Sequence, residues 1–367
     1  MICSSTRLLT AAALTALFVP TLQAAAQQHV PPAPDSTTPQ SAPPPDQPSA
    51  GQQTPPAAPP EQPSAGQPAA PTAQEPAAPA PSGPPTFPPP DPANFTAAAP
   101  TKETVNAFLQ ATWGFDDTRI WQVQGILKTP VESISKVIVL VGDKTGKDKP
   151  QALAFFVLPD GKHLISGDQI IEFGDHPYAE TRRQLEQRAD GPYRGSASKD
   201  LELVEFADFQ CPHCKEAQAN MDKLVTDYPK ARIVFEALPL QSIHPQAVLA
   251  SEYGQCVTKL GGSTAFFTFA AAVFDGQDGL STSDGATLTL NSAAAKAGLD
   301  PAKVAACAAT PETKAAVDAS SKLGSDLGIV QVPTLVVNGR EISPNAPYDV
   351  LKKVIDYQAK LDGVTAQ

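Results

Sequence analysis

The chain has 367 residues and a formal net charge of -11 at pH 7. Its length allows two globular domains, and its charge argues against a nucleic-acid partner, because phosphate binding needs a basic face. No part of the sequence gathers Lys and Arg into a basic cluster, so an acidic surface is expected.

Residues 1–26 have the pattern of a signal peptide. Arg7 supplies the positive charge, residues 8–19 form a short apolar core, and the alanines at 24–26 offer a cleavage site between small residues. This pattern predicts export to the periplasm or the extracellular space, which are oxidising compartments where disulfides persist. If the segment is not cleaved, it anchors the chain in the membrane.

Residues 27–100 form a tract rich in Pro, Ala and Gln. Of the 40 prolines in the chain, 25 lie between Pro31 and Pro100, and no Lys or Arg occurs there. With so few large apolar side chains, the tract cannot bury enough surface to offset the entropy of ordering it. We expect a disordered linker with extended polyproline II character. Whether it binds a partner stays open.

Residues 101–190 predict a small α+β domain. Val105, Phe108 and Leu109 recur at helical spacing, and three strand-like runs follow them. The Asp160-Gly161 pair marks a hairpin turn, and residues 176–190 have the pattern of a connecting helix. Because this part has no nucleophile beside a base, we expect it to serve in dimerisation or substrate positioning.

Residues 196–367 predict an α/β domain. A β-rich run ends at two cysteines and is followed by a helix, a second strand and an alanine-rich helical stretch at about 245–327. The Asn338-Gly339 pair then turns one strand into another, and a helix closes the chain. The order is a βαβ half followed by a ββα half, with helices inserted between them.

The two cysteines stand where the first strand of this domain turns into a helix, in the sequence Cys211-Pro212-His213-Cys214. Free N–H groups and the helix dipole favour an anion at Cys211, so its thiolate is activated as a nucleophile and as a leaving group. Cys214, one turn further on, is close enough to form a disulfide with it. His213 can add a positive charge or a hydrogen bond beside the thiolate.

Other readings of the cysteine pair are weaker. Covalent haem needs a histidine directly after the second cysteine, and Lys215 stands there. Structural zinc needs two further ligands, but Cys256, Cys307 and His244 form no second Cys-x-x-Cys pair. The sequence therefore predicts no cofactor and no metal. A purely structural disulfide stays open as an alternative.

Two acidic residues precede the cysteines. Glu205 lies six residues before Cys211 in an apolar strand, and central strands bury both faces. A buried carboxyl there has a raised pKa and can exchange a proton with Cys214; a solvent-facing Glu205 is the alternative. Asp208 is a weaker candidate, expected on a more exposed turn.

Val332-Pro333-Thr334 precedes the hairpin near the end of the chain. A cis-proline at this place presents its backbone to an extended substrate peptide. A plain proline at the start of a strand is the equal alternative.

The stretches EFADFQCPHCKEAQ and VPTLVVNGR resemble the DsbA family of thiol-disulfide oxidoreductases, which have a thioredoxin fold with an inserted helical subdomain. The resemblance covers about 196–367. It implies that Cys211 is the nucleophile, that Cys214 resolves the mixed disulfide, and that Pro333 is cis beside them.

The hairpin LPDGKHLISG resembles the N-terminal region of DsbC-type isomerases, which dimerise through that domain. The two resemblances favour different functions. The first implies an oxidase that donates disulfides to exported proteins, and the second implies an isomerase or reductase of DsbC or DsbG type. A non-catalytic binding or chaperone module of the envelope is a further alternative.

The expected partners follow from these functions. They are reduced or misfolded exported proteins as substrates, a membrane-bound or soluble redox partner, and a second copy of the chain that pairs through residues 101–190.

Cys256 and Cys307 lie in the predicted helical insertion. In an oxidising compartment we expect a structural disulfide that joins two helices. Two buried free thiols or a second redox relay are the alternatives.

Overall fold

The computed structural model describes residues 87–146, 149–167 and 169–366. The predicted signal peptide (1–26) and residues 27–86 of the predicted linker lie outside the described residues. In chain order the elements are η1 (Pro92–Asn94), α1 (Lys102–Trp113), β1 (Arg119–Lys128), β2 (Ser135–Asp143), β3 (Gln151–Val157), β4 (His163–Ser166), β5 (Gln169–Glu172), α2 (Ala179–Arg188), β6 (Tyr193–Gly195), β7 (Glu202–Ala207), α3 (Pro212–Asp227), β8 (Arg232–Ala237), α4 (Ala247–Asp275), η2 (Gln277–Ser281), α5 (Ser283–Lys296), α6 (Pro301–Ala308), α7 (Pro311–Asp326), β9 (Thr334–Val337), β10 (Arg340–Ile342) and α8 (Tyr348–Leu361).

The first sheet has the order β1-β2-β3-β4-β5 with antiparallel neighbours. Helix α1 packs Val105, Phe108 and Leu109 against Val137 and Val139 of β2. The hairpin predicted at the Asp160-Gly161 pair joins β3 to β4. Strands β1 and β2 coincide with the predicted runs, which are rich in Ile, Val and Leu. Strand β5 has only four residues and was not predicted.

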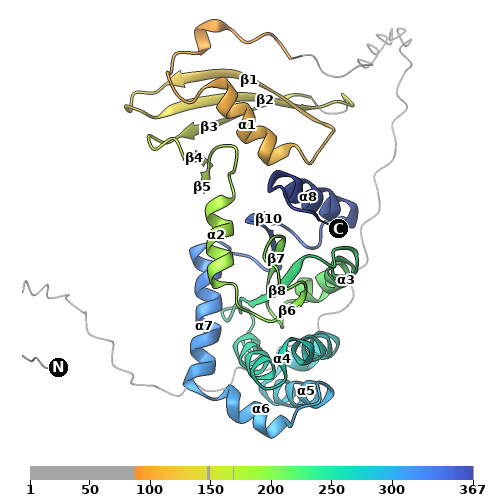
Figure 1. The fold of residues 1–367 in the computed structure, drawn as a ribbon. Coiled ribbons are helices and arrows are strands. Elements are labelled where there is room, and N and C mark those ends of the chain that lie inside the picture. Colours follow the sequence, from red (N-terminus) through yellow and green to blue (C-terminus); the bar gives the residue numbers. More distant parts are fainter. Residues whose placement is uncertain (1–86, 147–148, 168, 367) are drawn as a thin grey trace, which may run out of the picture. The chain divides into compact units, whose positions relative to one another are not determined.

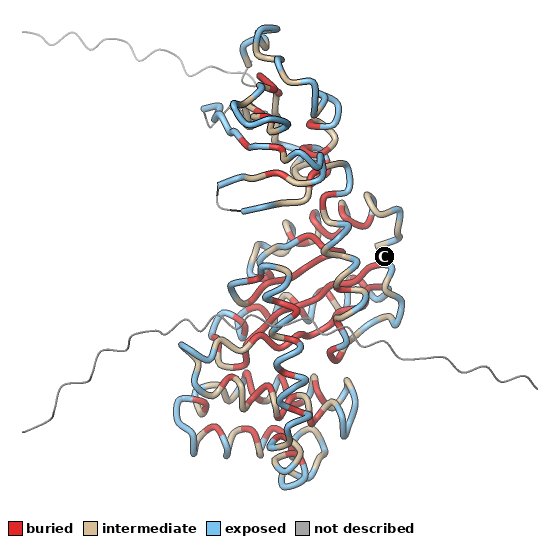
Figure 2. The backbone as a smooth tube through the Cα atoms, turned by 90° about the vertical axis from the view of Figure 1, so that its left-hand side faces the viewer, coloured by how far each residue is buried: buried red, intermediate tan, exposed pale blue. Residues whose placement is uncertain are grey.

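The second sheet has the order β10-β9-β7-β8-β6 (Figure 1). Strands β7 and β8 are parallel, and β9 runs antiparallel to β7. All six residues of β7 and all six of β8 are buried, which the burial colours of Figure 2 show as continuous red runs. Strand β7 is therefore the central strand whose end positions the cysteine pair.

Helices cover both faces of the second sheet. On one face, Met221 and Leu224 of α3 and Leu351 of α8 pack on Leu203 and Leu335. On the other face, Leu185 of α2 and Leu323 of α7 pack on Val204, Phe206 and Val336. These three layers confirm the predicted α/β class, because β7 and β8 need apolar cover on both faces.

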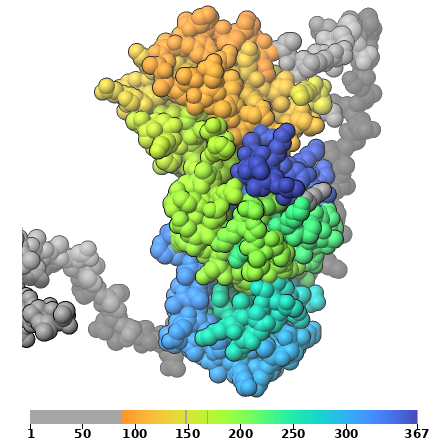
Figure 3. Space-filling model, in the orientation of Figure 1, coloured from red at the N-terminus to blue at the C-terminus, as the bar shows by residue number. Residues whose placement is uncertain are grey.

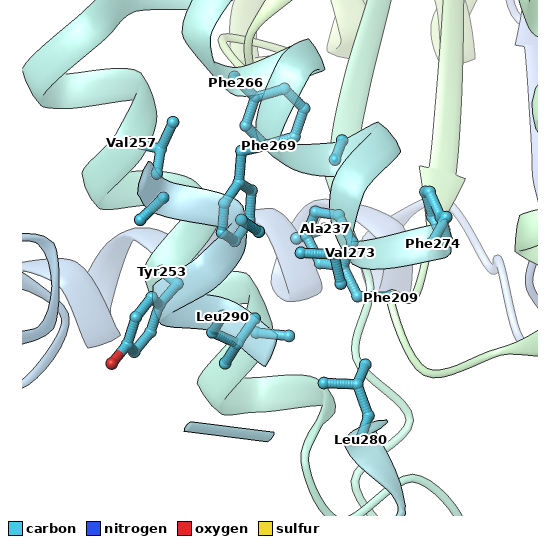
Figure 4. Packing of buried hydrophobic residues seen from close by; sticks show 14 of the residues in the cluster. Phe209, Ala237, Tyr253, Val257, Phe266, Phe269, Val273, Phe274, Leu280 and Leu290 are labelled. Carbon is cyan, nitrogen blue, oxygen red and sulfur yellow. The ribbon is translucent and has the colours of Figure 1, made fainter. Parts of the chain in front are cut away.

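Helices α4 to α7 form the helical insertion between β8 and β9. In Figure 3 the surfaces of α4 (teal) and α5 (light blue) adjoin. Among the described residues, α4 alone is long and apolar enough to cross a membrane, but Gly262, with φ 74° and ψ -175°, interrupts it. Its phenylalanines instead enter the core of the insertion, together with Phe209 from the cysteine turn (Figure 4).

A disulfide joins Cys256 of α4 to Cys307 of α6, with the two Cα atoms 5.8 Å apart. The Thr313 hydroxyl lies 3.3 Å from the Cys256 sulfur.

Candidate active site

The cysteine pair stands at the start of α3. Cys211 is the N-cap residue, with extended φ and ψ of -76° and 121°, and Pro212 is the first helical residue. Proline suits this position because the first N–H of a helix has no partner within the helix. The backbone N–H of Cys211 donates to the Asp208 carbonyl at 3.1 Å, which closes the turn between β7 and α3.

The thiols of Cys211 and Cys214 are not bonded to each other. Cys211 is 5% exposed and Cys214 is fully buried. An incoming sulfur atom can therefore reach the Cys211 sulfur but not the Cys214 sulfur.

The surroundings of the two sulfurs separate their proton affinities. A hydrogen bond from the Cys214 thiol, the backbone N–H groups of Cys214 and His213, and the charge of His244 lower the pKa of Cys211 to about 6, although burial opposes them. The same hydrogen bond, together with burial and the charge of Glu205, raises the pKa of Cys214 far above its usual range. At neutral pH Cys211 is the thiolate and Cys214 keeps its proton.

Glu205 is buried beneath the pair, at 2% exposure. Its Oε1 accepts a hydrogen bond of 2.8 Å from the Gln218 Nε2, which also donates to the Cys214 carbonyl at 3.1 Å. Burial raises the pKa of Glu205 to about 7, with the Gln218 hydrogen bond opposing it. A carboxyl with this pKa can both give and take a proton near neutral pH.

The sequence predicted that Asp208 lies on an exposed turn. This prediction is wrong, because Asp208 is fully buried. Its Oδ2 accepts from the Leu240 N–H and lies 2.8 Å from the His244 Nδ1, and its Oδ1 accepts from the Gln210 N–H at 2.7 Å. Its own N–H donates to the Cys214 sulfur at 3.3 Å. The turn faces inward because the loop after β8 supplies the donors that a buried carboxylate needs.

The His213 side chain does not point to the sulfurs. Its Nδ1 lies 2.9 Å from the Glu216 Oε2, and the ring is 68% exposed. The hydrogen bond to Glu216 is the main reason why the pKa of His213 is raised. The backbone N–H group of His213 lowers the pKa of Cys211, and the charge of Cys211 in turn contributes to the raised pKa of His213.

The Val332-Pro333 peptide bond is cis. The Val332 carbonyl oxygen lies 3.8 Å from the Cys211 sulfur, and Thr334, the next residue after the proline, starts β9 beside Phe206 of β7. The Thr334 hydroxyl donates to the Gln331 carbonyl at 2.9 Å. The structure thus places Val332 next to the Cys211 sulfur and shows Pro333 in the cis state, one of the two alternatives that the sequence left open.

Residues from the helical insertion hold the cysteine turn from the other side. The Gln277 Nε2 donates to the carbonyls of Phe209 and Cys211 at 2.8 and 2.9 Å. The ring of Phe209 packs on Phe266, Phe269 and Phe274. Gln277 was not predicted, since it lies 63 positions after Cys214 and no pattern in the sequence links the two.

Cys256 and Cys307 belong to the insertion and are bonded to each other. No group of three or more His, Cys, Asp or Glu side chains in the described part of the chain could hold a metal ion.

Comparison with known proteins gives a family match for the part of the chain that contains the second sheet. The Thioredoxin family matches residues 187–357. This match and the fold confirm the predicted thioredoxin fold.

Solved structures with a similar fold cover about half of the chain. Oxidised BdbD from Bacillus subtilis is 22% identical, with 46% of this chain and 93% of that chain covered and a TM-score of 0.43. A thioredoxin-like oxidoreductase from Silicibacter pomeroyi is 24% identical, with 49% and 98% covered and a TM-score of 0.42. The thiol-disulfide exchange protein α-DsbA2 from Wolbachia pipientis is 20% identical, with 48% and 95% covered and a TM-score of 0.41.

Curated relatives match over a shorter segment. The Na⁺/H⁺ antiporter NhaA 3 of Salinispora tropica is 34% identical over 91 residues, and NhaA 1 of Mycolicibacterium vanbaalenii is 33% identical over 92 residues. Each match takes in 25% of this chain and 14% of the antiporter. This chain therefore spans a small fraction of the length of these relatives, and antiport is stated of them alone.

Proposed function

We propose that this thioredoxin-fold oxidoreductase forms and exchanges disulfides in exported proteins through Cys211 and Cys214. The difference between the two thiols carries the proposal. Cys211 is reachable and has a pKa of about 6, whereas Cys214 is fully buried with a pKa raised far above its usual range. A nucleophile and a protected resolving thiol are what disulfide exchange requires.

In the oxidising direction, a substrate thiolate attacks the Cys211 sulfur of the Cys211–Cys214 disulfide. The bond between the two enzyme sulfurs breaks, and Cys214 leaves with the electron pair and takes a proton, for which Glu205 is the nearby donor. A second substrate thiolate then attacks the substrate sulfur of the mixed disulfide, and Cys211 leaves as a thiolate. The substrate loses two electrons, which the enzyme gains.

We favour oxidation over isomerisation because the hydrogen bonds to Cys211 stabilise its thiolate, and hence the reduced protein. A stabilised reduced form makes the disulfide form a stronger oxidant. To turn over, the enzyme then needs a redox partner that carries a disulfide and accepts the two electrons.

Substrate docking is proposed for Val332, Pro333 and Thr334, with the Val332 carbonyl 3.8 Å from the Cys211 sulfur as support. An extended substrate segment would pair with this backbone beside the nucleophile. Export from the cytoplasm is supported by the N-terminal sequence and by the Cys256–Cys307 disulfide, since disulfides persist in oxidising compartments.

We propose that the first domain pairs two copies of the chain. Phe156 and Ile170 are exposed apolar side chains on one face of its sheet, where each flanks Ile165, which supports an interface there. Sedimentation equilibrium tests this assembly, and a mass that stays monomeric at micromolar concentration would contradict it.

Two assays test the proposed reaction: dithiol-dependent reduction of insulin and oxidative refolding of a reduced substrate protein. The expected result is activity in both assays for the wild type and none for Cys211→Ser. Full activity of Cys211→Ser would refute the proposal and favour a binding module whose cysteines are structural.

A further inference from the structure

His244 lies in the loop between β8 and α4, 30 residues beyond Cys214 in the chain. Its Nδ1 lies 2.8 Å from the Asp208 Oδ2, and its side chain is 15% exposed while that of Asp208 is fully buried. Its backbone N–H donates to the Leu240 carbonyl at 2.9 Å, which fixes the loop. His244 is thus held through both its backbone N–H and its imidazole ring.

Asp208 links this histidine to both cysteines. Its N–H donates to the Cys214 sulfur, and its carbonyl accepts from the Cys211 N–H. Of the three groups bound by its carboxylate, the Gln210 and Leu240 N–H groups are neutral, and only His244 can carry a positive charge. Asp208 therefore holds a side chain that can carry a positive charge on the turn that positions the redox pair.

The other histidine of the site also binds a carboxylate through its ring, but it differs in its exposure to solvent. The His213 ring binds Glu216 on the surface, and both side chains are more than 60% exposed. Water screens a charge in that position strongly. A charge at His244 is screened less, because its ring is mostly enclosed by protein. Consistent with this, the charge of His244 contributes to the lowered pKa of Cys211.

We propose that His244, held by Asp208, is the positioning residue that stabilises the Cys211 thiolate electrostatically. His244 forms no bond to substrate and keeps its Nδ1 proton on the hydrogen bond to Asp208. The titratable groups that face this arrangement are Asp208, the thiols of Cys211 and Cys214, and Glu205, which acts on Cys214.

This inference rests on the proposed exchange activity. Its consequence is that His244 helps to set the reduction potential of the Cys211–Cys214 couple. A less positive electrostatic potential at the Cys211 sulfur destabilises the thiolate and hence the reduced protein. Loss of the His244 charge therefore makes the Cys211–Cys214 disulfide less oxidising.

The test compares His244→Gln with His213→Gln as a matched control, and with His244→Arg, which keeps a positive charge. Iodoacetamide alkylation of Cys211 is followed against pH, and the same proteins are equilibrated with glutathione buffers. We expect His244→Gln to slow alkylation at pH 6 by roughly threefold and to shift the equilibrium with glutathione by a similar factor. His213→Gln should change either quantity by less than His244→Gln does, because water screens its exposed side chain, and His244→Arg should recover most of the loss.

The outcomes separate the two proposals. Failure of the wild-type pair to exchange with glutathione would refute the proposed function. Normal exchange with identical profiles for His244→Gln and wild type, or a larger effect of His213→Gln, would overturn the role of His244.

A measurement on the wild type covers the case in which His244→Gln does not fold. The imidazole resonance of His244 is titrated before and after alkylation of Cys211. Removal of the thiolate should lower the titration midpoint of His244, because the two charges stabilise each other, and an unchanged midpoint would overturn the inference.

Discussion

Two cysteine pairs of the chain each have a fully buried member but differ in what surrounds their sulfurs. Cys211 and Cys214 lie one helical turn apart, where N–H groups, a thiol and the charge of His244 converge on the outer sulfur. Cys256 and Cys307 lie 51 residues apart on α4 and α6 and are bonded to each other, with a threonine hydroxyl as their neighbour.

This difference shows that burial does not decide the role of a cysteine. Cys214 and Cys256 are both fully buried, yet only Cys214 has an acid and a thiolate beside it. Hydrogen-bond donors and charges near a sulfur set its proton affinity and so its reactivity. The predictions below concern variants that remove a sulfur atom or a carboxyl group near one.

The largest expected effect comes from removing one sulfur from each pair in turn. Cys211→Ser should lower oxidative refolding activity by roughly 10³-fold or more, because the serine hydroxyl is a poor nucleophile and cannot form the disulfide. The matched variant, Cys256→Ala with Cys307→Ala, should keep activity within about twofold, because that pair makes no contact with substrate in the proposed mechanism. Equal losses in the two proteins would abolish the distinction between the pairs.

For stability, the larger effect is expected from removing the Cys256–Cys307 pair. Cys256→Ala with Cys307→Ala should lower the free energy of unfolding by about 2–4 kcal/mol, because the disulfide restricts a long loop in the unfolded chain. Urea unfolding without reductant measures this loss, with reduced Cys211→Ala as the control that removes no crosslink. A double variant as stable as the wild type would contradict a structural role for the disulfide.

Glu205 and Glu236 offer a second matched pair, since burial raises the pKa of each to about 7. Glu236 binds the Ser320 hydroxyl and the Gly191 N–H instead of facing a thiol. Glu205→Gln should slow the proton-dependent step at Cys214 by roughly ten- to a hundredfold, and Glu236→Gln should leave it unchanged. Rapid-mixing kinetics with a small disulfide measures this step, and equal rates in the two variants would remove Glu205 from the mechanism.

The smallest effect concerns the pH dependence of stability. Folded Glu205 and Glu236 hold protons up to pH 7, whereas the unfolded chain releases them near the usual carboxyl value of 4.5. The folded state therefore binds more protons between these values, and stability falls as the pH rises from 4.5 through 7. Glu205→Gln should flatten this fall in urea unfolding, as should Glu236→Gln. A wild type whose stability rises over this range would show that the carboxyls are not buried as described.

Much of the site was predictable because its signals are local. The spacing of Cys211 and Cys214 places both sulfurs at one helix start, and the apolar residues around Glu205 predict its burial. The Asn338-Gly339 pair predicts a turn because both residues accept positive φ, and they have φ values of 45° and 92°.

The remainder depends on contacts between distant segments. Asp208 was expected to be exposed, because only the loop at Leu240 and His244 supplies the donors that allow it to be buried. His244 was weighed as a metal ligand alone, since nothing in the sequence shows that it meets the cysteine turn. The cis state of Pro333 was left open for the same reason, because the packing of β9 beside β7 decides it.

The reduction potential of the Cys211–Cys214 couple in the full chain tests the central claim most directly. Equilibration against graded glutathione buffers, followed by thiol trapping, measures it while the Cys256–Cys307 disulfide serves as an internal reference. The account predicts a potential above roughly -200 mV for Cys211–Cys214 and a Cys256–Cys307 bond that survives every buffer. A Cys211–Cys214 potential below about -300 mV, as structural disulfides have, would contradict it.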